Sequence, residues 1–390
     1  MKNVAIDLIA AGTGFKGAKN HGGGEYCKTV FDYCYHKSNG QFHVIIADND
    51  DLNDFLKPYN NLIIHRCKDS KDYNDLLNKE LFDVVFSGLL DGQYDDVKFP
   101  NQTKLIFTEH GLRGIEVKFD KIFVKTEKKK FKNRVKMIMS KVMPKRYLKT
   151  KIGIYKGEFE IAKNYELVTV SEHSKYAIMN YFPYVKNVFV GYSPMKIVNG
   201  NTDDSILNKY SLEKGKYILM VSASRGEKNC LRGMMAIDKL KKENALPKDI
   251  KVVMTGVTYE KPFKKYVDNN VVVLGYVDTI TLETLYKNAH LFLYPTVNEG
   301  FGYPPLEAMK YHTLVATSAI TSVPEVCGDS VIYFNPYDVN EIKNRIMQSF
   351  DEKIRQYHIS KIDDRLAYIS QKQQEGLERL YLKIFGDANE

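Results

Sequence analysis

Short apolar runs alternate with amphipathic stretches along the chain, and this alternation constrains the fold more than any other feature. In the first half, the runs that predict strands are Asn3–Ala11, His43–Ala47, Leu62–His65, Asp83–Phe86 and Lys104–Thr108. Stretches between them, such as Glu25–His36 and Tyr73–Leu81, predict helices. Strands that alternate with helices form parallel sheets covered by helices on both faces. The sequence therefore predicts an α/β fold.

The alternation runs in two series, which predicts two domains. A further strand, Leu167–Val170, is followed by Ser171 as a helix N-cap and by a helix over Glu172–Tyr181. Gly, Ser, Pro and Asn then gather near Gly191–Asn201, which indicates a linker. The second series predicts strands at Tyr217–Val221, Lys251–Thr255, Val271–Leu274, Leu291–Tyr294, Leu314–Ala316 and Val331–Phe334.

We therefore expect two domains and a terminal helix. The N-terminal domain spans residues 1–195 and the C-terminal domain residues 196–365, and a helix over 366–390 packs back towards the N-terminal domain. Two parallel-sheet domains that face each other place a ligand in the cleft beyond the carboxyl ends of both sheets.

Composition excludes several classes of protein. The 390 residues are 44% hydrophobic and 27% charged, which is ordinary for a globular chain and excludes wholesale disorder. No run of about 18 apolar residues predicts a transmembrane helix, and the apolar N-terminal stretch is interrupted by Asp7, unlike a signal peptide. Five widely spaced cysteines without a C-x-x-C pair indicate reduced core thiols in a cytoplasmic protein, with no metal site.

A net charge of +9 is concentrated in one segment. Lys125–Lys151 contains twelve Lys or Arg and one acid, Glu127, and its apolar residues recur at spacings of three and four. This pattern predicts a basic amphipathic helix that stops at Pro144. Either its apolar stripe packs on the domain core, or the helix lies on an acidic membrane surface. The membrane contacts would then include Lys128, Lys129, Lys130 and Lys132. Nucleic acid is not expected as a partner, because no nucleic-acid-binding motif accompanies the segment.

Two glycine motifs follow the first strand. Gly12-Thr-Gly-Phe-Lys-Gly17 spells G-x-G-x-x-G, but poor helix formers follow it and the expected acid, Asp48, lies 31 residues after Gly17. NAD or FAD is therefore not predicted. The residues Gly22, Gly23 and Gly24 precede the helix predicted near Glu25, where backbone N–H groups can approach a phosphate. A plain flexible turn is the other interpretation.

The most informative segment is Glu299-Gly-Phe-Gly-Tyr-Pro-Pro-Leu-Glu307, which follows a strand and leads into a helix. Its glycines let the backbone approach a ligand, and the helix N-terminus offers N–H donors to a phosphate. Glu299 can accept hydrogen bonds from sugar hydroxyls, and Glu307 can accept two from a vicinal diol such as ribose. Alternatively, Glu307 is a first-turn acid that complements the helix dipole.

This segment resembles the E-x7-E signature of retaining GT-B glycosyltransferases similar to glycosyltransferase family 4. Gly275-Tyr-Val, Leu293-Tyr-Pro-Thr and Val323-Pro-Glu-Val are similar to that family in the same order, over roughly residues 217–340. In the N-terminal half, Thr108-Glu-His-Gly and Val168–Lys175 are the similar pieces. The resemblance implies a GT-B fold and transfer of a sugar from a nucleotide diphosphate, UDP or GDP, with retention and without a metal or other cofactor.

The resemblance also implies roles for individual residues. Glu299 and the backbone of Gly300, Phe301 and Gly302 hold the donor sugar, with Tyr303 and Leu306 nearby, and Glu307 holds the ribose. Ser224–Asn229 resembles the basic run of the family, so Arg225 and Lys228 stabilise the leaving diphosphate. Gly275, Tyr276 and Val277 lie near the base, and Gly22–Gly24 close on the phosphates.

The catalytic set that the resemblance implies is His110, Glu299, Lys228 and Arg225. His110 forms a hydrogen bond with the donor sugar or the acceptor rather than acting as a general base, and the flanking Glu109 and Arg113 contact the acceptor. The sequence departs from the family at Tyr311-His312, where glycine is usual. Either His312 packs under the sheet, which we expect, or it alters the choice of sugar.

We therefore expect a cytoplasmic glycosyltransferase, peripheral on the inner membrane face, that extends a glycan or a lipid-linked acceptor during assembly of a cell-surface polysaccharide. One alternative is a GT-B-like epimerase or hydrolase of nucleotide sugars, which consumes the donor without an acceptor. The other is a non-catalytic, polybasic protein that binds membrane or RNA.

Overall fold

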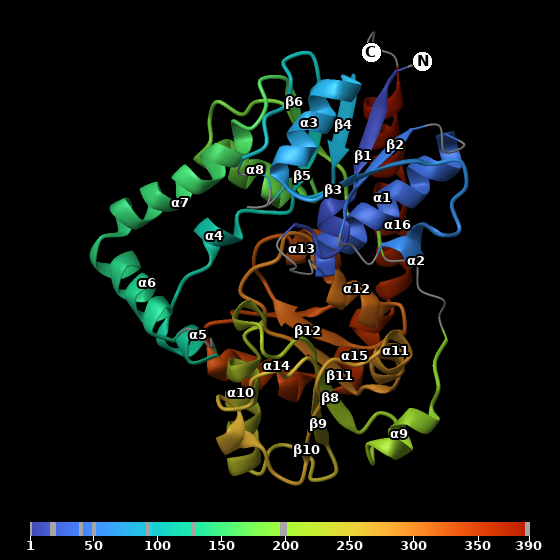
Figure 1. The fold of residues 1–390 in the computed structure, drawn as a ribbon. Helices are drawn as coiled ribbons and strands as arrows, with labels where there is room; N and C mark the ends of the chain where they lie inside the picture. The colour runs from blue at the N-terminus through green and yellow to red at the C-terminus, as the bar shows by residue number, and fades with distance from the viewer. Residues whose placement is uncertain are drawn as a thin grey trace. The chain divides into compact units, whose positions relative to one another are not determined.

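The computed structural model divides by its contacts into two compact units. It describes residues 2–15, 21–38, 42–48, 52–90, 94, 96–126, 130–195 and 201–386. The first unit takes in Met1–Leu112, Lys149–Ile197 and Ser370–Glu390, and the second takes in Arg113–Leu148 and Val198–Ile369. Each unit is built on one parallel sheet (Figure 1).

The first unit contains a seven-stranded parallel sheet in the order β3-β2-β1-β4-β5-β6-β7. The strands are β1 Val4–Asp7, β2 His43–Ala47, β3 Ile63–Cys67, β4 Val84–Ser87, β5 Lys104–Glu109, β6 Tyr165–Thr169 and β7 Val188–Val190. Its helices include α1 His21–Ser38, α2 Asn53–Leu56, α3 Ser70–Glu80, the 3-10 helix η1 Ile9–Ala11 and α8 Glu172–Tyr181. Ser171 caps α8 as predicted, since its Oγ accepts the Ser174 N–H at 3.1 Å.

The second unit contains a six-stranded parallel sheet in the order β10-β9-β8-β11-β12-β13. The strands are β8 Tyr217–Met220, β9 Lys251–Met254, β10 Val271–Val273, β11 Leu291–Tyr294, β12 Val315–Ser318 and β13 Ile332–Phe334. Its helices include α4 Arg113–Glu116, α9 Ser205–Lys209, η2 Gly226–Lys228, α10 Cys230–Lys242, η3 Lys264–Tyr266, α11 Thr279–Asn288, α12 Tyr303–Met309, α13 Val323–Cys327, η4 Gly328–Ser330, α14 Val339–Gln348 and α15 Glu352–Ile359. The predicted α/β fold of parallel sheets with helices is thus confirmed for both halves of the chain, and each half is Rossmann-like.

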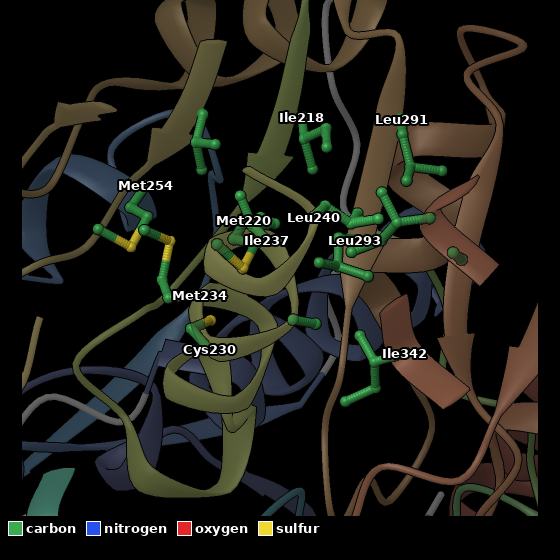
Figure 2. Packing of buried hydrophobic residues seen from close by; sticks show 14 of the residues in the cluster. Ile218, Met220, Cys230, Met234, Ile237, Leu240, Met254, Leu291, Leu293 and Ile342 are labelled. Carbon is green, nitrogen blue, oxygen red and sulfur yellow. The ribbon is translucent and has the colours of Figure 1, made fainter. Parts of the chain in front are cut away.

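Apolar side chains from the strands and from α10 make the core of the second unit. Ile218 and Met220 of β8 and Leu293 of β11 are fully buried, and Ile237 and Leu240 of α10 are within 1% of full burial. Figure 2 shows these side chains gathered between the sheet and the helices, with Ile342 of α14 among them. A closely packed interior of this kind holds the strand ends, and the loops that leave them, in fixed positions.

The contact units differ from the predicted domain limits in one segment. The change of unit near Ile197 lies close to the predicted limit at residue 195, and Ser370–Glu390 belongs to the first unit. Arg113–Leu148, however, makes its contacts within the second unit, although the sequence placed it in the first domain. The reason is that residues preceding the basic segment pair with loops of the second sheet, as described below.

Helices at three places differ from the sequence expectation. Helix α1 begins at His21, so Gly22–Gly24 form its first turn rather than a loop before it. The basic segment is divided among α5 Lys121–Thr126, α6 Lys130–Val142 and α7 Pro144–Phe159. Helix α6 ends two residues before Pro144, and Pro144 is the first residue of α7. Proline fits the first helical turn because its missing N–H has no partner there in any case. The third is the tail, in which α16 Ile362–Phe385 starts four residues before the helix predicted over 366–390.

Two expectations from the composition concern the cysteines and membrane-spanning helices. Cys27, Cys34, Cys67, Cys230 and Cys327 are all free thiols, as predicted. Burial raises the pKa of each thiol, to about 12 for Cys230 and Cys327. Among the described residues, no helix is long and apolar enough to cross a bilayer.

Candidate functional site

The second sheet has a topological switch point between β8 and β11. These neighbouring strands lie at the centre of the sheet, and their connections lead to opposite sides of it. Ligands of open α/β sheets bind beyond the carboxyl ends of the strands at such a point. The loop after β8 carries Arg225 and Lys228, and the loop after β11 carries Glu299. Chain topology therefore brings these three predicted residues to one edge of the sheet.

Lys228 and Glu299 form an ion pair at this edge. Lys228 Nζ lies 2.7 Å from Glu299 Oε1 and 2.6 Å from the hydroxyl of Tyr294, the last residue of β11. The Lys228 side chain is only 7% exposed and that of Glu299 11%. Because two buried charges are stable only when paired and hydrogen-bonded, the pair fixes both side chains in place.

One oxygen of Glu299 accepts three hydrogen bonds. Besides Lys228, the Tyr294 hydroxyl at 2.6 Å and the Thr296 hydroxyl at 2.7 Å donate to Oε1. Burial, together with the neighbouring Glu299 carboxylate, raises the pKa of Tyr294 well above its usual range, so this phenol remains a donor. No donor among the described residues reaches Oε2. The carboxylate is thus held by one oxygen and can accept from a ligand through the other.

Arg225 lies in a second charged group on the same loop. Its Nε donates to Glu227 Oε1 at 2.8 Å, and Arg113 Nη1 lies 3.1 Å from the same oxygen. Burial alone lowers the pKa of Arg225, but the Glu227 carboxylate outweighs it and raises that pKa overall. Burial alone would raise the pKa of Glu227, but the neighbouring Arg225, Lys228 and Arg113 outweigh burial. The pKa is therefore lowered overall, and Glu227 is ionised. Three cations against two carboxylates leave an excess positive charge that suits an anion.

Asn229 holds the two loops together, and sequence reasoning gave it no role. Its amide donates to the Pro295 carbonyl at 2.8 Å and to the Pro336 carbonyl at 2.9 Å, and it is 3% exposed. Its φ of 55° is left-handed, a conformation that asparagine tolerates better than most residues. In the structure this asparagine directly precedes Cys230, where helix α10 begins, and asparagine is common at such a helix start.

The backbone of the loop Glu299–Gly302 is held by hydrogen bonds with residues that were not predicted from the sequence. The Thr321 hydroxyl accepts the Glu299 N–H at 3.1 Å, and the Ser322 hydroxyl donates to the Glu299 and Phe301 carbonyls at 3.0 and 2.9 Å. Gly302 has φ 104°, which requires glycine, and precedes α12. Two of the first three residues of α12 are prolines without an N–H, so this helix start offers fewer donors than we expected.

Glu307 lies on α12, where its carboxylate is half-buried. The Tyr286 hydroxyl of α11 donates to Glu307 Oε2 at 3.0 Å. Burial and the Glu307 carboxylate raise the pKa of Tyr286 well above its usual range, so it too remains a donor. The neighbouring Leu306 is fully buried and Tyr303 is half-buried, so only Tyr303 can offer its side chain to a ligand.

The predicted base-contacting residues follow β10. Tyr276 is 68% exposed, and Gly275 is exposed as well. The Gly275 carbonyl accepts the Gly256 N–H at 2.8 Å, which ties this segment to the end of β9. Val277 follows in the same irregular stretch before α11. Tyr276 thus presents an aromatic ring at the surface on a backbone that is held in place, and aromatic rings stack on planar groups.

Three other predicted residues belong to the first unit. Gly22 is exposed, but a Cβ at Gly23 would lie 2.7 Å from Leu89 Cδ2, and one at Gly24 would lie 3.2 Å from the Ala11 carbonyl oxygen. The glycines therefore serve the close packing of α1 on the turn after β1. Their predicted phosphate contact stays a prediction. Gly17 of the G-x-G-x-x-G motif lies outside the described residues.

Glu109 is the last residue of strand β5 in the first unit, and His110 follows it. His110 Nε2 lies 2.9 Å from the Gly88 carbonyl, and since a carbonyl only accepts, Nε2 carries the proton. Burial lowers the pKa of His110, so the ring is neutral and Nδ1 is an acceptor. Burial and the nearby Glu158 raise the pKa of Glu109 to about 8, so its carboxyl is largely protonated at neutral pH.

The expectation that His312 packs under the sheet is wrong. The side chain is exposed, and its Nε2 lies 2.8 Å from Asp363 Oδ1. The physical reason is its backbone, which ends the turn after α12 with a φ of 54°. A left-handed residue at this position explains why glycine suits it in similar proteins.

The structure thus brings together Arg225, Lys228 and Glu299, and adds Tyr294 and Asn229. Of the residues predicted to contact a membrane, Lys132 is exposed. Lys128 and Lys129 lie outside the described residues, as does the side chain of Lys130. Within the described part of the chain, no group of three or more His, Cys, Asp or Glu side chains is arranged to hold a metal ion.

Comparison with known proteins gives a match for the part of the chain that contains this edge. Residues 202–365 match the family model described as Glycosyl transferases group 1. The O-antigen chain mannosyltransferase B of Escherichia coli is 29% identical over 208 residues, covering 48% of this chain and 51% of that protein. O-antigen chain mannosyltransferase RfbU of Salmonella typhimurium is 33% identical over 143 residues, covering 35% and 38%. The chain spans about half, or less, of the length of these relatives.

A solved structure is similar over nearly the whole chain. HepE of Anabaena in complex with UDP has a TM-score of 0.67 and 14% identity, covering 97% of this chain and 99% of its own. At this identity the likeness shows the fold alone, and it agrees with the two parallel sheets described above.

Proposed function

Residues 202–365 form a domain of the glycosyl transferases group 1 family on a GT-B fold, and from this premise we propose that the chain is a glycosyltransferase whose donor site lies at the carboxyl edge of the second sheet. The observation that carries the proposal is the Lys228–Glu299 pair at the switch point, 2.7 Å apart and one-tenth exposed. A buried cation beside a carboxylate with an available oxygen can hold a phosphate and a sugar hydroxyl at once.

The donor in this proposal is a nucleotide diphosphate sugar, with UDP or GDP as the nucleotide. Glu299 Oε2 accepts from hydroxyls of the sugar, while the loop backbone from Gly300 to Gly302 lies beside it. Glu307 accepts from the ribose diol, since Tyr286 holds one of its oxygens in place. Tyr276 stacks on the base. HepE, which shares the fold, was solved in complex with UDP, and this is why UDP is among the nucleotides to be tested.

Bond cleavage in this proposal depends on Lys228 and Arg225. As the bond between the anomeric carbon and the phosphate oxygen breaks, negative charge collects on the leaving diphosphate. Lys228 and Arg225 stabilise this charge by charge-assisted hydrogen bonds. We infer that the two cations do this without a metal ion.

We infer retention of configuration, because the site resembles that of retaining enzymes. In a front-face reaction the acceptor oxygen bonds to the anomeric carbon on the side that the diphosphate leaves. The proton of the acceptor hydroxyl passes to the leaving phosphate oxygen, so no separate base is required. Glu299 is unsuited to act as a base through Oε1, which already accepts three hydrogen bonds.

The relatives support a narrower substrate class. Both O-antigen relatives are named mannosyltransferases, so we propose a mannosyl or similar hexosyl donor and a growing surface glycan as acceptor. Five buried free thiols favour a cytoplasmic location. The contacts predicted for residues of the first unit, by His110 with the sugar or acceptor, by Glu109 with the acceptor and by Gly22–Gly24 with the phosphates, stay predictions.

A panel of nucleotide sugars tests the proposal. Thermal unfolding is followed with UDP- and GDP-linked hexoses, because a ligand that binds the folded state raises the melting temperature by mass action. We expect one donor to stabilise the wild type and to lose about tenfold or more in affinity on Glu307→Ala, since a half-buried hydrogen-bond acceptor is removed. With an acceptor present, the same donor should give a product of unchanged anomeric configuration by NMR.

The control is Glu341→Ala, which removes a half-buried carboxylate from α14, outside the loops of the site. The proposal is contradicted if no nucleotide sugar stabilises the protein, or if Glu307→Ala and Glu341→Ala bind the donor equally well. Consumption of the donor without an acceptor, at the full rate, would instead favour a hydrolase or epimerase.

A further inference from the structure

Helix α6 carries its apolar side chains on the outside of the molecule. Phe131 is 82% exposed, Val142 72%, Ile138 55% and Val135 40%. Their spacing of four, three and four residues places all four within about 60° of one another around the helix axis. These four residues form one continuous stripe, which we call the outer stripe, on α6 (Figure 1, blue-green).

This orientation is the reverse of that of an ordinary surface helix, which turns its apolar stripe towards the core. On α6 the residue that is buried is polar: Asn133 is 7% exposed and lies on the opposite side of the helix from the outer stripe. The possibility that the apolar residues pack on the domain core is therefore wrong. An apolar partner that covered these four side chains would remove their surface from water, which is favourable in free energy.

Cations flank the outer stripe on both sides. At 100° per residue, Lys132 lies on one side of the stripe, and Arg134 and Lys141 lie on the other. All three side chains are exposed. The sequence has no acid between Lys130 and Gly157. The helix therefore presents an apolar band between two rows of positive charge.

We propose that α6 lies flat on an anionic lipid bilayer, with the outer stripe in the boundary between headgroups and acyl chains. The flanking cations then lie at the level of the lipid phosphates, which is the arrangement of interfacial helices. The charge selects this partner. A second copy of the chain would bring one row of cations against another, and a nucleic acid offers no apolar layer for Phe131 and Val142.

The helix is joined to the candidate site within the second unit. It follows α5, and α5 contacts both η2, which carries Lys228, and α10. Asp120 caps α5 and pairs with Arg232 of α10, while Glu116 accepts from Asn298 at 2.9 Å. A membrane-bound α6 would hold the donor loops close to the bilayer, which suits an acceptor carried on a lipid. Membrane binding itself does not depend on the proposed function.

Vesicle flotation tests the proposal with the full chain. Vesicles of phosphatidylcholine alone and vesicles that also contain phosphatidylglycerol are compared at low and high salt. We expect binding only to the anionic vesicles, and weaker binding at high salt because ions screen the attraction. The variant K132Q/R134Q/K141Q should bind about a hundredfold more weakly at low salt. The variant F131S/V142S should lose about tenfold or more at either salt concentration.

Matched controls change the same residue types elsewhere on the second unit. K261Q/K264Q/K353Q removes three exposed cations, and Met347→Ser removes an apolar side chain that is 44% exposed. Both should bind anionic vesicles as the wild type does. Because every changed side chain is exposed, the variants should unfold at the wild-type temperature, which thermal unfolding checks.

Three results would overturn the proposal. The first is equal binding by the α6 variants and their controls. The second is a dimer in sedimentation that F131S/V142S abolishes while no vesicle binds. The third is binding of RNA, lost in K132Q/R134Q/K141Q, again without vesicle binding.

Discussion

At the scale of single residues, the candidate site depends on how Glu299 is held. Three donors fix one of its oxygens, and all three, Tyr294, Thr296 and Lys228, are themselves buried. Glu299, Lys228 and Glu307 could be singled out from the sequence because their spacing is distinctive. Tyr294 could not, because a tyrosine at the end of a buried strand looks like any core residue until its hydroxyl is located.

Lys228→Ala is predicted to lower turnover more than donor affinity. The cation is placed to meet charge that develops on the leaving phosphate, and losing one such group costs about a hundredfold or more in kcat. Steady-state kinetics with the donor identified above measures both parameters. Lys353→Ala, an exposed lysine on α15, is the control. If kcat is unchanged and kcat/KM falls only because KM rises, Lys228 serves donor binding alone and the prediction is wrong.

Glu109→Gln is predicted to remove a pH dependence of stability. The pKa of Glu109 is raised from 4.5 to about 8 in the folded protein. Between these values the folded state keeps a proton that the unfolded state has lost, so stability falls as pH rises from about 5 to about 8. Because the carboxyl is half-buried and keeps some water contact, we expect a difference on the order of 1–3 kcal/mol.

Urea unfolding at several pH values measures this difference. The wild type should lose stability relative to Glu109→Gln as the pH rises, and the difference should level off above pH 8. Parallel curves for the two proteins across the range would show that Glu109 ionises at an ordinary pKa.

At the scale of elements, the close approach of two loops sets the geometry of the site. Gly256 follows β9 with φ 67°, and a Cβ there would lie 2.9 Å from Ser222 Cα, at the start of the loop that carries Arg225 and Lys228. Gly215 has a similar φ of 71° but open space around it. A side chain at either position would strain the backbone, but only one at Gly256 would also collide with Ser222. Comparing the two substitutions therefore separates the cost of the strain from the cost of the collision.

Gly256→Ala is therefore predicted to destabilise the protein by about 1–3 kcal/mol more than Gly215→Ala. It should also weaken donor binding, because the backbone at Ser222 must move, whereas Gly215→Ala should leave binding unchanged. Thermal unfolding and donor titration measure the two effects. Equal destabilisation by both substitutions would mean that the contact with Ser222 relaxes without consequence.

Element positions followed closely from the sequence, whereas orientations did not. The predicted strands at His43–Ala47 and Leu291–Tyr294 and the helix Glu172–Tyr181 have the bounds found in the structure. The basic segment was recognised as amphipathic, but periodicity defines a stripe without saying which way it faces. Phe131 is 82% exposed in the structure, and no local sequence pattern reports this orientation.

At the scale of the whole molecule, the chain leaves the first unit and returns to it. Helix α16 begins in the second unit, and from Ser370 its residues contact the first. Gln373 donates to the Ser193 carbonyl at 2.6 Å, and a Cβ at Gly376 would lie 3.1 Å from Gly191 Cα. The sequence predicted this return, but the strand ends on which it packs could not be read from a helical pattern.

Gly376→Val is predicted to loosen the first unit selectively. The added side chain would separate α16 from the residues that follow β7, and we expect a loss of about 1–3 kcal/mol. Hydrogen exchange should rise in β6, β7 and the end of α16, and stay unchanged in β8 to β13. Gly157→Val, in open space on α7, is the control for helix propensity. Faster exchange in the second sheet would contradict the division into units.

Hydrogen exchange with and without the stabilising nucleotide sugar tests the central claim most directly. If the donor lies at the switch point of the second sheet, amide exchange should slow in two segments, residues 222–229 after β8 and residues 295–307 after β11. Unchanged exchange in both loops, with protection confined to other segments, would contradict the claim that the Lys228–Glu299 pair holds the donor.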